Sequence, residues 1–66
     1  MTDKQREVIL AMAKHNMNVT DAAMGLHYHR NSLLYHIERI EMKYGLNPRR
    51  FYDLCKLLKM VEELDV

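Results

Sequence analysis

Two helix-forming stretches separated by only three residues constrain this chain more than any other feature. The first stretch, residues 18–26, starts with Asn18, a residue type that caps helices, and has Asp21 at the third helical position. The second stretch, residues 30–44, repeats apolar side chains at helical spacing: Leu33, Ile37, Ile40 and Tyr44. Because so short a link forces a tight turn, the pattern predicts a helix-turn-helix whose second helix points its polar first turn outward.

The flanking segments predict two further helices and no strand. Residues 3–15 place Ile9 and Met12 on one side of a helix. Asn47-Pro48 joins a capping residue to a proline, which suits the first position of a helix. We therefore expect an all-α fold, a single small four-helix domain over residues 1–66, with helices at about 3–15, 19–26, 30–44 and 48–64.

The last predicted helix is apolar around most of its circumference. An arc of about 120°, wide enough to cap a three-helix core, holds five residues: Phe51, Leu54, Cys55, Leu58 and Val61. Three further apolar residues lie outside this arc: Leu57, Met60 and Leu64. Single exposed apolar residues are common on protein surfaces, but a strip of three indicates a partner surface. We therefore expect a homodimer in which this helix pairs with its copy, with Leu57 near the centre of the interface.

Charge is distributed unevenly along the chain, although the net charge is only +1. Residues 27–50 contain five Arg and Lys against two Glu, so this segment carries +3 before its three histidines are counted. The preceding segment is neutral and the following one is acidic. Positive charge on the helix-turn-helix is what a phosphate backbone requires, although an ordinary solvated surface would also explain so modest a field.

The sequence also limits where the chain works. No apolar run approaches the ~20 residues that span a bilayer, and the N-terminus lacks the apolar core of a signal peptide. Cys55 is the one cysteine, so an internal disulfide is impossible and a reducing cytoplasm is the expected location. We expect no membrane association.

The first turn of the second helix carries the side chains with the chemistry for reading DNA. Arg30 can bind guanine or a phosphate, Asn31 can pair with adenine, and Ser32 suits a phosphate oxygen. His29 is expected to cap this helix, and Tyr35 to reach a phosphate or pack on a sugar. The predicted DNA contacts are His29, Arg30, Asn31, Ser32, Tyr35, His36, Arg39, Lys43 and Arg49.

Metal binding and catalysis have little support in the sequence. His27, His29 and His36 form a loose pattern without cysteine or carboxylate ligands nearby. No nucleophile–base pair or paired carboxylates converge, so we expect no metal, no cofactor and no enzymatic activity.

The segment HRNSLLYHIERIEMKYGLNP resembles the C-terminal helix-turn-helix domain of the bacterial purine-catabolism and sugar-diacid regulators (PucR and CdaR type), which is related to the Fis-type motif. The similarity extends over roughly residues 5–62 and rests on three groups of residues: His29–Leu33 with Tyr35, Arg39–Ile40, and Gly45–Pro48 followed by Phe51 and Asp53. The resemblance implies a Fis-like fold and sequence-specific binding to double-stranded DNA in transcription regulation.

Two departures from the family pattern bear on function. Leu34 and His36 stand where family members usually have polar or basic residues, so this recognition helix is less basic. The family domain also closes a longer regulator with an effector-sensing region, whereas this chain begins with Met1, so the resemblance implies no sensor and no small-molecule effector for it. The first functional hypothesis is a DNA-binding transcription regulator. The alternative is a protein-interaction module that keeps the fold with little DNA affinity.

Overall fold

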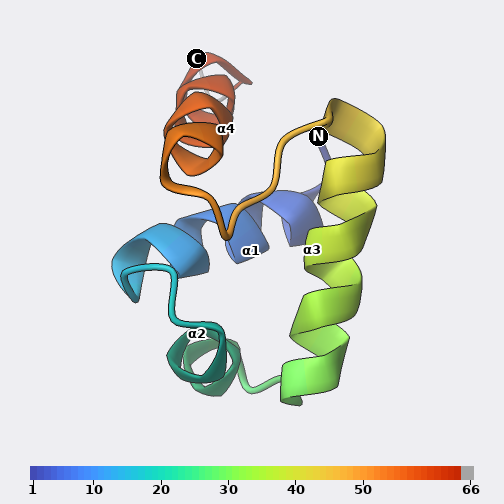
Figure 1. Cartoon of the computed structure of the whole chain (residues 1–66), viewed down its shortest axis with the longest axis vertical. Helices are drawn as coiled ribbons and strands as arrows, with labels where there is room; N and C mark the ends of the chain where they lie inside the picture. The colour runs from blue at the N-terminus through green and yellow to red at the C-terminus, as the bar shows by residue number, and fades with distance from the viewer. Residues whose placement is uncertain (65–66) are drawn as a thin grey trace.

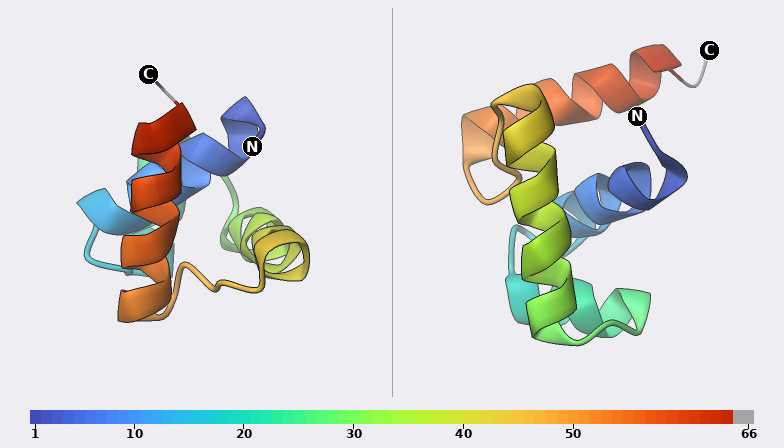
Figure 2. Two further views of the ribbon diagram at one scale, coloured as in Figure 1. Left: turned by 90° about the horizontal axis from the view of Figure 1, so that it is seen from above. Right: turned by 90° about the vertical axis from the view of Figure 1, so that its right-hand side faces the viewer.

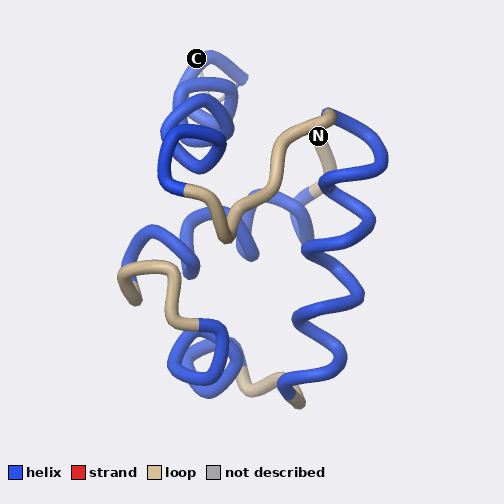
Figure 3. The backbone as a smooth tube through the Cα atoms, viewed as in Figure 1, coloured by secondary structure: helices blue, strands red, loops and turns tan. Residues whose placement is uncertain are grey.

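The computed structural model describes the backbone of residues 1–64 and the side chains of residues 1–63. Over that range the chain forms four helices and no strand: α1 (Asp3–Lys14), α2 (Val19–Leu26), α3 (Arg30–Tyr44) and α4 (Phe51–Leu64). The expected all-α, four-helix fold is confirmed. Figure 1 shows α3 along one side of the molecule, with α2 near its N-terminal end, and Figure 3 shows the short loops between the helices.

Helix α1 is the centre of the packing. It packs against α2, α3 and α4, whereas α4 packs against α1 alone among the described helices. The two views in Figure 2 show α1 crossing behind α3 and beneath α4. Three α1 side chains, Val8, Ile9 and Met12, have no exposed surface at all. The position of every other helix therefore depends on how it meets α1.

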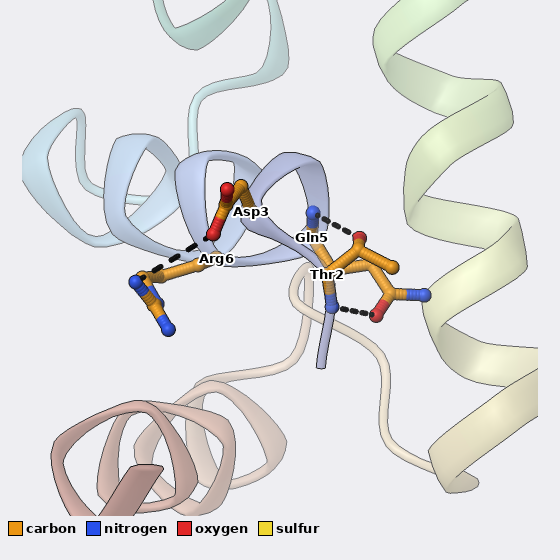
Figure 4. Close-up of polar contacts among 4 residues, drawn as sticks. All are labelled: Thr2, Asp3, Gln5 and Arg6. Carbon is orange, nitrogen blue, oxygen red and sulfur yellow. Dashed lines mark hydrogen bonds and ion pairs between the residues drawn. The ribbon is translucent and has the colours of Figure 1, made fainter. Parts of the chain in front are cut away.

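The N-terminus of α1 is closed by a capping box. The Thr2 hydroxyl accepts a hydrogen bond from the backbone N–H of Gln5 at 3.1 Å. The Gln5 side-chain oxygen accepts one in return from the backbone N–H of Thr2 at 3.0 Å. Figure 4 shows this pair and the nearby ion pair of Asp3 with Arg6 at 3.8 Å. The two capping hydrogen bonds satisfy the backbone N–H groups of Thr2 and Gln5, which a helix start would otherwise leave unpaired.

The core joins small side chains on α2 to branched ones on α3 and α4. Ala22 and Ala23 are 0% and 2% exposed, so α2 lies close to its neighbours where a larger side chain would not fit. The other two helices contribute Leu33, Ile37, Ile40, Leu54, Leu57 and Val61. The inward stripe predicted for α3 is confirmed at Leu33, Ile37 and Ile40, since all three are buried.

Helix α4 begins three residues later than predicted, at Phe51 rather than Pro48. The Asn47 side-chain oxygen accepts from the N–H of Arg49 at 2.8 Å. The N–H of Arg50 donates to the Asn47 carbonyl at 3.0 Å. Both hydrogen bonds lie within residues 47–50, so these residues form a turn. The Asn47 side chain therefore caps this turn and not the start of α4.

The face of α4 that packs on the core is rotated about the helix axis by about 60° from the predicted face, at 100° per residue. Leu54, Leu57 and Val61 face the core, whereas Phe51 is 60% exposed and Cys55 is exposed. The rotation is fixed by a side chain near the helix start, since the Asp53 carboxylate accepts from the backbone N–H of Asn47 at 3.1 Å. A helix that is apolar on most sides does not specify its own rotation, so the turn and the contact with α1 decide it.

This rotation removes the predicted dimer strip. Leu57 is 0% exposed and belongs to the core, so it cannot lie at the centre of an interface with a second chain. Met60 is half-buried against the same core, and the side chain of Leu64 lies outside the described residues. The exposed large apolar residues of α4 are instead Phe51 and Tyr52, whose rings meet edge to face with centroids 5.5 Å apart.

Candidate nucleic-acid interface

The turn between α2 and α3 has the predicted length of three residues. Helix α2 ends at Leu26, His27 takes the left-handed conformation with φ of 60°, and α3 begins at Arg30. The approach of α2 to the end of α1 is close at Gly25, where an added Cβ would lie 2.7 Å from Nε2 of His15. The turn thus joins two helices that α1 holds firmly in place.

The first turn of α3 is open. His29 occupies the N-cap position, as predicted, but its side chain makes no capping hydrogen bond. The N–H groups of a helix's first turn have no partner within the helix. Arg30, Asn31 and Ser32 supply these amides, and all three residues are exposed. An uncapped helix start surrounded by exposed polar side chains favours an anionic ligand.

The outward face of α3 continues from this turn along the helix. Tyr35 is 56% exposed and Arg39 is exposed, on the side opposite the buried stripe. His36 is half-buried, with its ring 5.8 Å from that of Tyr28 and 5.5 Å from that of Tyr35. The structure therefore brings these predicted residues onto one face, although His36 lies at its edge.

Cations flank this face on both sides. On the side next to α1, Arg39 and Lys43 line a shallow hollow together with Gln5 of α1. On the other side, Arg49 lines a hollow with two carboxylates of α3, those of Glu38 and Glu41. The hollow beside α1 has two cations and no carboxylate, whereas the other hollow has one cation and two carboxylates, so the positive charge is concentrated on the side next to α1.

The C-terminal half of the face is less suited to DNA. Glu38 is exposed there, and the Met42 side chain is 76% exposed. A carboxylate in this position repels phosphate, so the first two turns of α3 are better suited to an anionic partner than this half of the helix.

One basic residue beside the face was missed. The Lys4 ammonium on α1 donates a hydrogen bond to the Tyr28 hydroxyl and lies 4.6 Å from the centre of the Tyr28 ring. The Tyr28 hydroxyl in turn donates to the Glu7 carboxylate at 3.3 Å. The hydrogen bond to Tyr28 raises the pKa of Lys4 above its usual value. Lys4 is 24 residues from Tyr28 in sequence, so only the packing of α1 against the turn shows this neighbourhood.

Neither a cluster of potential metal ligands nor a membrane-spanning helix is present in the part of the chain that the structure describes. No group of three potential metal ligands comes together among these residues. Within the same range, no helix has the length and apolar character needed to cross a bilayer.

Comparison with known proteins identifies the family. The PucR C-terminal helix-turn-helix domain matches residues 5–61, which is most of the chain and all of the face described above. No curated protein and no solved structure matches the chain. The matched family is one of helix-turn-helix DNA-binding domains that are typically non-catalytic. From its four helices, its three-residue turn and this match, the chain belongs to the PucR C-terminal helix-turn-helix domain family.

Proposed function

We propose that this domain binds double-stranded DNA sequence-specifically, with α3 in the major groove, and regulates transcription. The observation that carries the proposal is the uncapped first turn of α3, exposed on a base whose inward side chains are fully buried. A rigid helix whose polar N-terminal turn projects from the surface is the docking geometry of this class of proteins.

Specific and non-specific contacts are assigned to different residues. Arg30, Asn31 and Tyr35 are the proposed base-reading or groove-floor contacts, because they lie on the first two turns and are exposed. Ser32 and the free amides of the first turn, beside His29, are proposed to hold a phosphate oxygen. The remaining proposed contacts are to the DNA backbone: His36, Arg39, Lys43 and Arg49.

Specificity of this kind is normally obtained from two half-sites about one helical turn of DNA apart. We therefore propose that two copies of the domain bind together on one operator. The surface through which they meet is not the Leu57 strip, since Leu57 is in the core. Two copies on one duplex would be measured as a stoichiometry of two chains per site, and a single chain per selected site would refute this part of the proposal.

The decisive experiment starts from a random-sequence duplex library, from which bound sequences are selected and an operator is defined. Arg30→Ala and Asn31→Ala are each expected to cost roughly 1–3 kcal/mol on that operator and much less on random DNA. Lys59→Ala is the control, because Lys59 is an exposed cation on α4 away from the recognition face. If both α3 variants bind the operator as tightly as the parent, the assigned face is wrong. If the parent binds no duplex at all, the interaction-module alternative replaces the proposal.

A further inference from the structure

Lys4 stands out because the helix-turn-helix motif does not include it, yet it touches the turn that leads into α3. Its ammonium is hydrogen-bonded to the Tyr28 hydroxyl and lies over the Tyr28 ring. An ammonium has three N–H donors, and Tyr28 takes one of them. Two donors are left, and the Lys4 side chain is exposed.

The Lys4 side chain lies on the same flank of α3 as two proposed phosphate contacts. Tyr28, which holds the ammonium, contacts the ring of His36 on α3. The next residue of α1, Gln5, accepts a hydrogen bond from the Tyr44 hydroxyl at 3.3 Å and lines a hollow with Arg39 and Lys43. The start of α1 therefore lies near this edge of the recognition helix, which α1 crosses as Figure 2 shows.

We propose that Lys4 binds a DNA phosphate beside the recognition helix, and that the Tyr28 hydroxyl is the positioning group that holds its ammonium there. The proposal rests on the proposed function and adds to it a contact from α1, outside the motif. With Arg39 and Lys43, Lys4 would form a row of three cations facing one phosphate backbone.

Glu7 is the group that could oppose this role, since its carboxylate accepts from the same Tyr28 hydroxyl. The Glu7 side chain also lines a hollow with Leu10, Leu26 and other residues, none of which belongs to α3. Lys4 itself is exposed. Its long side chain also keeps its charge in water, where a phosphate can reach it.

The test measures binding of the full chain to a fluorescein-labelled random-sequence duplex of about 30 base pairs, by anisotropy between about 50 and 200 mM salt. Each phosphate contact contributes about 0.9 to the slope of log affinity against log salt. Lys4→Met is expected to lower this slope by about 0.9, while Lys4→Arg keeps it. Tyr28→Phe keeps the ring and the lysine charge, so it is expected to weaken binding severalfold with the slope unchanged.

Lys14→Met is the matched control, since it removes the same charge from the far end of the same helix. Its slope is expected to equal that of the parent. If Lys4→Met leaves the salt slope equal to that of the parent, whether or not affinity falls, Lys4 only stabilises the turn and binds no phosphate. That outcome overturns the inference. That result leaves the proposed function standing, provided that Asn31→Ala still loses operator affinity. A parent chain that binds no duplex overturns both.

Discussion

Replacing Leu57 with alanine tests the rotation of α4, and the structure gives the expected size of the effect. Leu57 is 0% exposed, so the substitution removes three buried carbons worth about 0.8 kcal/mol each in transfer free energy. A cavity term is added because a packed core relaxes only in part, which gives an expected loss of about 3 to 4 kcal/mol. A domain of 66 residues has a free energy of unfolding of roughly 3–10 kcal/mol. The substitution therefore removes a large part of the stability.

Phe51→Ala is the comparison that makes the test specific. Phe51 is 60% exposed, so its truncation removes only a small buried area and is expected to cost about 1 kcal/mol. Urea unfolding followed by circular dichroism at the helical band gives both values in one assay, provided that the slope with denaturant stays the same. If Phe51→Ala destabilises the domain more than Leu57→Ala does, α4 packs through its other face and the rotation described above is wrong.

Two further predictions concern backbone conformation and helix capping. Gly45 and His27 both have positive φ, 69° and 60°. Gly45→Ala is therefore expected to lower the free energy of unfolding by about 1 kcal/mol, and His27→Gly is expected to raise it by a similar amount. If the two substitutions have the same effect, positive φ does not determine the stability at these positions. The Asn18 side chain accepts a hydrogen bond from the N–H of Asp21 at 2.9 Å. Asn18→Ala is therefore expected to lower the free energy of unfolding by about 1 kcal/mol in the same urea assay. An unchanged midpoint would show that this cap does not stabilise α2.

The local pattern of residues was enough to predict the helix-turn-helix. The interval between Leu26 and Arg30 sets the length of the turn, and the spacing of Leu33, Ile37 and Ile40 sets the buried face of α3. A helix with one apolar stripe specifies its own rotation, because only one face can be buried without leaving apolar surface in water. The exposure of Asn31 on the opposite face follows from the same periodicity, whereas Arg30 lies on the side of Leu33 and Ile37 and is exposed at the very start of α3.

The rotation of α4 and the neighbourhood of Lys4 were decided by the tertiary structure. Around α4, apolar residues occur on most sides, so the hydrogen bond between Asp53 and Asn47 and the contact with α1 select Leu57 for the core and leave Phe51 outside. Lys4 belongs to a segment with no net charge, and its contact with Tyr28 forms only when α1 packs across the turn. Periodicity records which residues share a face of one helix. It carries no information on which neighbour that face meets, because contacts between segments distant in sequence depend on how the whole core packs.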